Sequence, residues 1–257
     1  MVRGLYTAYT GMNNEQKRLD IISNNLANAA TAGYKSEGVT SQSFDNLLTI
    51  KINDSSEFGL NRNIGSMSLG VKLGEVYTDY SQGAFHETGN TFDLAIEGNG
   101  FFAVNVKNTN GEDKTLYTRD GNFKMDKEGY VVDSEGNHLI GSGGYLQVPT
   151  DASDLIVDTD GSVYADGEYV DRIEIKNFED TDYLKKYGTN MYEAADGATE
   201  ADASGLIHQG FIEQSNVNTV SEMVDMITIT RAYEANQKVI QTVDSTLQKS
   251  CNDLGKV

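Results

Sequence analysis

Hydrophobic residues near the C-terminus recur at the spacing of one long helix. From Thr219 onward the sequence has no proline and no glycine before Gly255. One row of positions seven residues apart holds Met226, Tyr233, Ile240, Leu247 and Leu254, and a second row, offset by three residues, holds Ile229, Asn236, Val243 and Ser250. This is a heptad seam, apolar except at Asn236 and Ser250. The predicted helix has about 36 residues and a length of about 54 Å, which indicates a partner lying alongside.

A matching pattern lies at the other end of the chain. Positions seven residues apart hold Leu5, Met12, Leu19 and Leu26, and the alternate seam positions hold Val2, Tyr9, Gln16, Ser23 and Ala30. The pattern predicts a second helix that ends at Gly33, because glycine can take the left-handed conformation of a helix end. The two helices could pair with each other, pair with other copies of the chain, or pack on a globular core. The pattern alone leaves these alternatives open.

Between the helices, residues 91–180 alternate apolar and polar positions with a period of two, which is typical of strands with one buried face. Leu94 and Ile96 start this pattern, and Tyr130 and Val132 continue it. Acid–glycine pairs punctuate the run at Asp120-Gly121, Glu128-Gly129, Glu135-Gly136, Asp160-Gly161 and Asp166-Gly167. Such pairs suit tight hairpins, and no helical stretch interleaves. We therefore expect an antiparallel β domain.

Two segments have weaker patterns. Residues 36–90 are rich in glycine, serine and asparagine after a short apolar cluster, and we expect an extended linker with a hairpin around Val71 to Tyr80. Residues 181–209 are expected to be a loop, with at most a short helix near Tyr183 to Tyr187. The fold class is thus α+β. The expected parts are an N-terminal assembly helix (1–35), a linker and hairpin segment (36–90), a β-rich outer domain (91–209) and a C-terminal assembly helix (210–257).

Charge divides the chain in the same way. The formal net charge is −19, of which residues 36–216 carry −20, residues 1–35 carry +2 and residues 217–257 carry −1. Near-neutral helices can pack against copies of themselves without strong repulsion, while an acidic outer domain keeps monomers soluble. Nucleic acid is an unsuitable partner, because the sequence contains no basic stripe that could neutralise phosphates.

Other compositional features narrow the class of protein. A single cysteine, Cys251, excludes an internal disulfide bond. The sequence contains no run of eighteen apolar residues, so it predicts no transmembrane helix. The polar N-terminal residues lead us to expect no cleavable secretory signal.

The sequence predicts no catalytic, cofactor-binding or metal-binding residues. Gly98-Asn99-Gly100 begins a dinucleotide-like motif, but strand alternation follows where a helix is required. Asp158-Thr159-Asp160-Gly161 lacks the acidic residue that closes a calcium loop. His86, His138 and His208 are each isolated in the sequence, which does not suggest zinc binding.

Three motifs, in order along the chain, resemble the flagellar rod and hook protein family. The first, in residues 11–35, has the core Asn24-Asn25-Leu26-Ala27-Asn28, Thr31 and Gly33-Tyr34-Lys35. The second comprises Asp93-Leu94-Ala95-Ile96, Gly98, Gly100-Phe101-Phe102 and Tyr117-Thr118-Arg119-Asp120-Gly121. The third comprises Glu213, Ser215-Asn216-Val217, Glu222-Met223-Val224, Met226-Ile227 and Arg231-Ala232-Tyr233-Glu234.

The resemblance implies a structural, self-assembling subunit of the bacterial flagellar basal-body rod that transmits torque from motor to hook, and not an enzyme. Its implied partners are copies of itself, other flagellar axial proteins of the rod and hook, and the flagellar type III export apparatus. Export would occur without a cleaved signal. The length is similar to that of the distal rod protein and of its close rod relative, and shorter than that of most hook proteins. We expect the distal rod; a proximal rod or hook-like axial protein is the alternative within the family. Outside the family, the alternative is a carbohydrate-active enzyme built on the β domain.

In the implied assembly, the two terminal helices form a coiled-coil-like layer. We expect the assembly interface to be formed by apolar seam residues and by the signature residues that flank them. These are Leu5, Tyr9, Met12, Leu19, Asn24, Asn25, Leu26, Asn28, Thr31, Gly33, Tyr34, Lys35, Ser215, Asn216, Val217, Met223, Met226, Ile227, Arg231, Tyr233, Glu234, Ile240 and Leu247.

Overall fold

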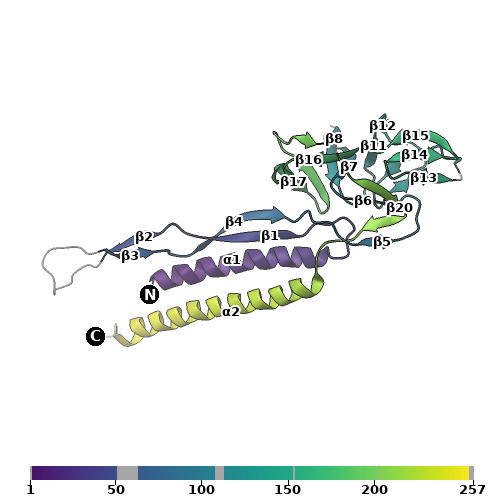
Figure 1. The fold of residues 1–257 in the computed structure, drawn as a ribbon. Helices are drawn as coiled ribbons and strands as arrows, with labels where there is room; N and C mark the ends of the chain where they lie inside the picture. The colour runs from purple at the N-terminus through teal and green to yellow at the C-terminus, as the bar shows by residue number, and fades with distance from the viewer. Residues whose placement is uncertain (1, 51–62, 108–112, 153, 202, 255–257) are drawn as a thin grey trace. The chain divides into compact units, whose positions relative to one another are not determined.

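The computed structural model of the chain describes residues 2–50, 63–107, 113–152, 154–201 and 203–254 (Figure 1). The chain folds into two compact units. Unit 1 contains residues 1–26, 37–78 and 219–257, and unit 2 contains residues 27–36 and 79–218. The chain therefore crosses between the units after residues 26, 36, 78 and 218. The four-part division expected from the sequence stays a prediction.

Unit 1 contains the two predicted helices, α1 (Val2–Ala27) and α2 (Thr219–Lys249), which lie side by side and antiparallel (Figure 1). A π-helical turn, Ser250–Leu254, continues α2, so the helical segment spans the predicted length. The expected end of the first helix at Gly33 is wrong, because α1 stops at Ala27. Short polar side chains compete with the helix there: the Thr31 hydroxyl donates to Asn28 Oδ1 at 3.3 Å. Among the described helices, none is long and apolar enough to cross a membrane.

A close approach and a hydrogen bond define the register of the helix pair. A Cβ atom on Gly11 would lie 3.0 Å from Asn236 Nδ2, so α1 approaches α2 closely at this point. Further along, Asn25 Nδ2 donates to Glu222 Oε1 at 3.2 Å. The two contacts are fourteen residues apart along each helix, so a single antiparallel register accounts for both.

The rest of unit 1 is a narrow antiparallel ribbon. Strand β1 (Glu37–Ser43) pairs with β4 (Val71–Thr78), and β2 (Leu47–Ile50) pairs with β3 (Asn63–Met67). The hairpin expected around Val71 to Tyr80 is wrong: Val71–Thr78 is a single strand, and its paired residues lie 28 (Ser43 to Val71) to 41 (Glu37 to Thr78) positions earlier in the sequence. Long-range pairing of this kind leaves no local turn signal. The part of the predicted linker between residues 51 and 62 lies outside the described residues.

Unit 2 is the predicted antiparallel β domain. Its main sheet has the order β17-β18-β8-β7-β11-β10-β9, with β12 paired to β11 and β16 paired to both β7 and β19. The other groups are β13-β14-β15, β6-β20 and β5-β21. Every ladder among the described residues is antiparallel. The bounds are β5 (Phe85–Glu87), β6 (Leu94–Glu97), β7 (Phe101–Lys107), β8 (Asp113–Thr118), β9 (Lys124–Met125), β10 (Val131–Val132), β11 (His138–Gly141), β12 (Gly144–Tyr145), β13 (Leu155–Val157), β14 (Ser162–Ala165), β15 (Glu168–Arg172), β16 (Ile175–Phe178), β17 (Leu184–Tyr187), β18 (Met191–Ala194), β19 (Glu200–Ala201), β20 (Leu206–Gln209) and β21 (Phe211–Glu213).

The acid–glycine turns behave as expected at four of five positions. The glycines of the pairs at residues 128–129, 135–136, 160–161 and 166–167 all have positive φ, between 85° and 89°. Gly121 is different, because a Cβ atom there would collide with the carbonyl oxygen of Leu94. This glycine is needed for a close approach of two backbones and not for a left-handed turn.

The expectation of a loop over residues 181–209 is wrong. The segment begins with a 3-10 turn, Thr181–Tyr183, and continues as strands β17, β18, β19 and β20. Leu184, Met191 and Tyr192 are buried in the core of unit 2. Each strand is too short to show a period, and pairing with β8 and β6 supplies the order that local sequence does not indicate.

Candidate functional site

Helix α2 carries apolar residues on two opposite faces. On one face, Ile229 is buried (3% exposed), while Met226, Tyr233 and Ile240 are half-buried. On the other face, Val220, Met223, Val224 and Ile227 follow the i, i+3, i+4, i+7 pattern, and each is more than half exposed. We call these four residues the α2 stripe. One helix partner can cover only one of the two faces.

Helix α1 also combines covered and uncovered surfaces. Leu5, Met12 and Leu19, from the predicted seam, are half-buried, and Ala8 is buried. Tyr6 and Tyr9 are exposed over more than half of their surface. Contiguous exposed apolar surface of this kind is typical of contact sites for other proteins.

The charge of unit 1 permits contact between copies. Unit 1 has 12 acidic and 10 basic residues, whereas unit 2 has 27 acidic and 10 basic residues. Net charges of −2 and −17 follow from these counts. Repulsion between copies is therefore weak at unit 1 and strong at unit 2.

Asn25, in the first signature, uses its amide within unit 1. Its Oδ1 accepts the Glu37 backbone N–H at 3.0 Å, and its Nδ2 donates to the Glu37 carbonyl at 2.9 Å. The same Nδ2 donates to Glu222 Oε1. One buried amide thus joins α1, β1 and α2. Burial raises the pKa of Glu222, and the hydrogen bond from Asn25 opposes this shift.

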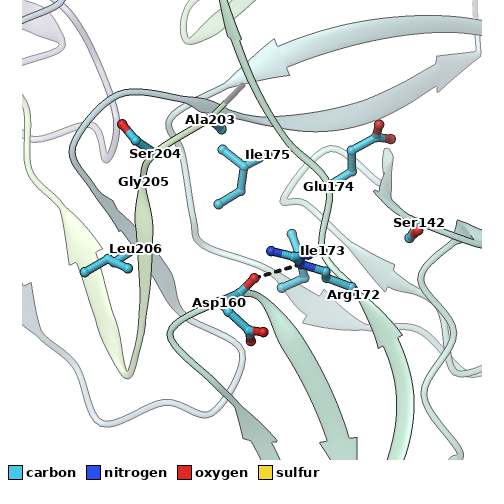
Figure 2. A pocket seen from close by; sticks show the side chains of 10 residues that line it. All are labelled: Ser142, Asp160, Arg172, Ile173, Glu174, Ile175, Ala203, Ser204, Gly205 and Leu206. Carbon is cyan, nitrogen blue, oxygen red and sulfur yellow. Dashed lines mark hydrogen bonds between the residues drawn. The ribbon is translucent and has the colours of Figure 1, made fainter. Parts of the chain in front are cut away.

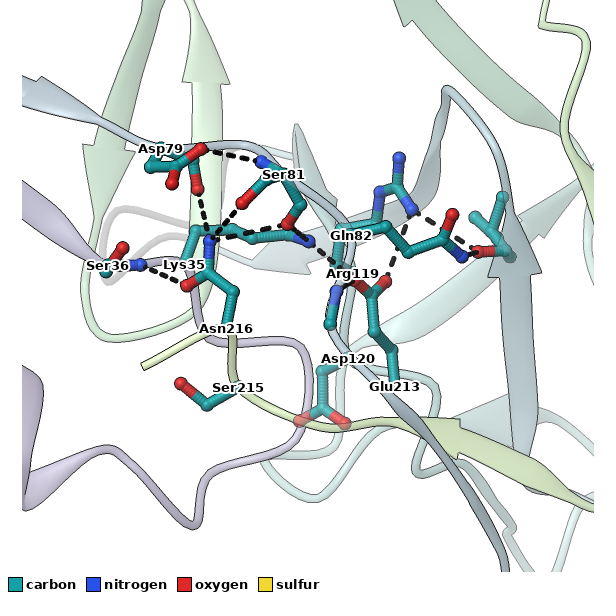
Figure 3. A network of polar contacts seen from close by, with 12 residues as sticks. Lys35, Ser36, Asp79, Ser81, Gln82, Arg119, Asp120, Glu213, Ser215 and Asn216 are labelled. Atoms are coloured by element: carbon teal, nitrogen blue, oxygen red, sulfur yellow. Dashed lines mark hydrogen bonds and ion pairs between the residues drawn. The ribbon is translucent and has the colours of Figure 1, made fainter. Parts of the chain in front are cut away.

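Residues from all three signatures meet inside unit 2 around Glu213 (Figure 3). Glu213 is fully buried, and its two oxygens face Lys35 Nζ at 2.5 Å and Arg119 Nη1 at 3.2 Å. The Glu213 Oε1 atom also accepts the Gly83 N–H at 2.8 Å. Lys35 and Arg119 are 1% and 5% exposed. Burial lowers the pKa of both cations, and the Glu213 carboxylate opposes this effect.

Backbone carbonyls and an amide complete the cluster. Lys35 Nζ donates to the Ser81 carbonyl at 2.8 Å, and Arg119 Nη2 donates to the Gly98 carbonyl at 2.7 Å. Asn216 Oδ1 accepts the Ser36 N–H at 2.8 Å. We call Lys35, Arg119, Glu213 and Asn216 the polar junction (Figure 3).

Gly33 and Tyr34 hold the first signature against this junction. The Gly33 N–H donates to the Glu213 carbonyl at 2.8 Å, and Gly33 has φ +66°. A Cβ atom on Gly33 would collide with the backbone of Arg119 and Asp120. Tyr34 is fully buried, and Lys186 Nζ lies 4.4 Å from its ring centroid.

Asp120, beside the junction, is a partly buried carboxylate. It accepts hydrogen bonds from the Asn122 N–H at 3.0 Å and from Asn190 Nδ2 at 2.8 Å. Burial nevertheless raises the pKa of Asp120 to about 6, with help from Asp133 and Asp93.

The expected interface residues therefore fall into three environments. Those exposed on the helices are Tyr9, Asn24, Met223, Ile227, Arg231, Glu234 and Leu247. Those buried or half-buried in unit 1 are Leu5, Met12, Leu19, Asn25, Leu26, Met226, Tyr233 and Ile240, and those buried or half-buried in unit 2 are Asn28, Thr31, Gly33, Tyr34, Lys35, Ser215, Asn216 and Val217. Their role in assembly stays a prediction.

Sequence reasoning omitted several residues from the expected interface. Val220 and Val224 complete the α2 stripe, and their helical spacing with Met223 could have revealed a second apolar face. Glu213 and Arg119 were visible in the signatures, but no pattern shows that they share an ion pair. Only the tertiary structure brings residues 94 positions apart together.

An open pocket of about 570 Å³ on unit 2 offers little for catalysis (Figure 2). Arg172 and Asp160 face each other there, and Arg172 Nε donates to the Asp160 carbonyl at 2.9 Å. Asp160 is exposed, and hydrogen bonds from Ser162 lower its pKa. A general acid at neutral pH needs a raised pKa instead. Glu174, also on the rim, forms an ion pair with Lys176 at 2.9 Å.

Three family models match the chain in succession. The model described as Flagella basal body rod protein matches residues 5–35, and the Flagellar hook protein FlgE/F/G D1 domain matches residues 95–165. The Flagellar basal body rod FlgEFG protein C-terminal model matches residues 208–254. These three regions contain the three signatures, apart from Asp93 and Leu94, which precede the second region.

Individual proteins are similar over nearly the whole length. Flagellar basal-body rod protein FlgG of Bacillus subtilis (strain 168) is 36% identical over 269 residues, covering 98% of this chain and 99% of that protein. FlgG of Caulobacter vibrioides is 35% identical, covering 96% and 97%. The flagellar hook-basal body complex protein FlhO of Bacillus subtilis is 32% identical, covering both chains in full.

Proposed function

The chain belongs to the flagellar basal-body rod protein family, and from this we propose that it is a distal-rod subunit whose terminal helices pack against further copies. It is a structural protein of the flagellar basal body, and the family is not one of enzymes. The rival assignment to a carbohydrate-active enzyme is therefore set aside. We propose the distal position in the rod because the chain is similar in sequence to FlgG rod proteins over nearly its whole length.

The α2 stripe is the observation that carries the assembly mechanism. Val220, Met223, Val224 and Ile227 expose an apolar surface opposite the face that is turned to α1. Burial of such a surface against another helix is worth roughly 25 cal/mol per Å² of apolar area. We propose that a second copy of the chain covers the α2 stripe. Each copy presents the same two helices, and unit 1 is nearly neutral, so two copies can approach there with little repulsion.

In the proposed assembly, helices of neighbouring subunits form a coiled-coil-like inner layer and unit 2 lies outside it. The exposed Tyr6 and Tyr9 of α1 supply the complementary apolar surface. Torque then passes between subunits through helix contacts. The acidic unit 2 limits association through any other face.

Assembly of purified full-length protein tests the mechanism. We expect filaments or tubes from concentrated wild-type protein in sedimentation and electron microscopy. The double variant Val224→Asp with Ile227→Asp should remain monomeric with an unchanged melting temperature, because both residues are exposed in the monomer. Gln241→Asp, at an exposed polar position of the same helix, is the matched control and should assemble. Assembly of the double variant at the wild-type concentration would refute the proposal.

A proximal-rod or hook-like position is the alternative within the family. FlgF of Mesorhizobium japonicum is 30% identical to this chain, against 36% for FlgG of Bacillus subtilis. Expression of this chain in Bacillus subtilis strains that lack either FlgG or FlhO distinguishes the distal position from the alternative. Restored swimming in the strain lacking FlgG supports the distal assignment, and restoration only in the strain lacking FlhO contradicts it.

The partners within the flagellum follow from the same proposal. We expect neighbouring rod and hook proteins to contact the ends of a stack of subunits. Passage through the flagellar export apparatus without cleavage completes the proposal. Mass spectrometry of protein recovered from purified basal bodies tests it, because an intact N-terminal segment is expected and a shortened one is not.

A further inference from the structure

The polar junction lies where three segments of unit 2 lead toward unit 1. Ser36 and Asp79 are the terminal residues of unit 2 at two crossings, and Asn216 lies two residues before a third, at Asn218. Asn216 Oδ1 accepts the Ser36 N–H, and Asn216 Nδ2 donates to the Asp79 carbonyl at 2.8 Å. The Asp79 N–H donates to the Ser36 carbonyl at 2.8 Å. The three crossing segments are thus hydrogen-bonded to one another within unit 2.

The ionic part of the junction anchors the same three segments in the interior. The three segments are residues 33–36, 79–83 and 213–216, and Lys35, Gly83 and Glu213 belong to them in that order. The Glu213 carboxylate contacts both others and also Arg119. Arg119 extends the anchor to the carbonyls of β6 and of the turn after it, at Ile96 and Gly98.

We infer that the polar junction is a clamp that makes the three segments resist detachment together. A pull on one connection from unit 1 must then break contacts that also hold the other two. Glu213 and Asn216 act as positioning residues for the chain connections. The contribution of the clamp to torque transfer rests on the proposed rod function, since only a subunit under load needs connections that yield together.

The physical cost of opening this clamp is high. Glu213 and Lys35 are buried almost completely, so separating them breaks an ion pair in a site where water cannot solvate the two charges. Two cations share one carboxylate, and removal of that carboxylate leaves both unpaired. Removal of either cation still leaves Glu213 with one partner.

Hydrogen exchange on dilute full-length protein, read by residue or by short peptide, tests the clamp. In Glu213→Gln we expect the amides of residues 33–36, 79–83 and 213–216 to exchange faster by one common factor, on the order of a hundredfold. Asn216→Ala, a milder change that retains the ion pairs, should accelerate the same three segments by roughly tenfold. Glu128→Gln, at an exposed glutamate of unit 2, is the matched control and should change none of them.

Two results would overturn the inference. If each variant accelerated exchange only in its own segment, the three connections would be independent. If exchange rose evenly through unit 2, including the sheet β13-β14-β15, the junction would be an ordinary stabilising cluster. Neither result depends on assembly, because the measurement uses monomers. Failure of wild-type protein to form filaments would contradict the proposed function and leave the clamp intact.

Discussion

Replacement of Asp120 by asparagine should stabilise unit 2 at neutral pH. The pKa of Asp120 is raised to about 6 from an ordinary value of 3.8, mainly by burial. A carboxyl group whose pKa is raised in the folded state destabilises that state while the group is ionised. Above pH 6 the folded protein therefore carries a cost that the unfolded chain does not. As the pH falls from 6 toward 4 the folded state takes up a proton first, and the cost disappears.

The magnitude follows from the pKa difference of about two units. Each unit corresponds to 1.36 kcal/mol, so the cost at pH 7.5 is at most about 3 kcal/mol. The Oδ1 atom of an asparagine at position 120 can still accept the hydrogen bond from the Asn122 N–H. The side-chain amide of Asn190 can flip, so that its oxygen accepts a hydrogen bond from the Nδ2 atom of the new asparagine. Allowing for imperfect replacement of these bonds, we expect Asp120→Asn to raise the free energy of unfolding by about 2 kcal/mol at pH 7.5. At pH 4.5 the gain should fall below about 1 kcal/mol.

Urea unfolding of unit 2, followed by near-ultraviolet circular dichroism of tyrosine, is a suitable assay because the chain contains no tryptophan. The variant and wild-type protein are compared at pH 7.5 and pH 4.5. Asp151→Asn, at an exposed aspartate, controls for the general effect of removing one negative charge from an acidic protein. An equal gain at both pH values, or a loss at pH 7.5, would refute the reasoning.

Three further predictions concern positions where the signatures meet the fold. Gly33→Ala should destabilise unit 2 by about 2 kcal/mol or more in the same urea assay, because the new Cβ collides with the Asp120 backbone at positive φ; unchanged stability would contradict this. Asn25→Ala should lower the melting temperature of unit 1 and cost about 2–3 kcal/mol through its lost hydrogen bonds, and a neutral effect would show that water replaces them. Gly11→Leu should abolish the nuclear Overhauser contacts between residue 11 and Asn236, whereas Gly11→Ala should retain them, since a Cβ would sit 3.0 Å from a movable amide.

Much of the architecture follows from local patterns. The heptad rows predict both helices because each row repeats over several turns, and the long α2 has no proline or internal glycine to stop it. The acid–glycine pairs predict turns such as the one at Gly161, which has φ +89°, because glycine takes this conformation without steric cost. Alternation in Phe101–Lys107 predicts the strand β7, but not that both of its faces are covered: its first five residues are all buried.

Where local signals compete or are short, prediction fails. The first helix is predicted to end at Gly33 but ends at Ala27, because a heptad pattern does not register the turn made by Asn28 and Thr31. Val71–Thr78 reads as a hairpin by composition, but its partner is β1, and no local turn specifies a pairing across so long an insertion.

The sequence by itself determined the helices, the antiparallel β class, the uneven charge and, through its signatures, the family. Only the tertiary structure decided how the signature residues are used. Lys35 and Glu213 are polar and would be placed at the surface by their type, yet they are buried together across 178 positions of sequence. Periodicity shows which face of a helix or strand is apolar and is expected to be buried. The identity of a buried partner depends on which distant segments the whole fold brings into contact, and a one-dimensional pattern does not carry that information.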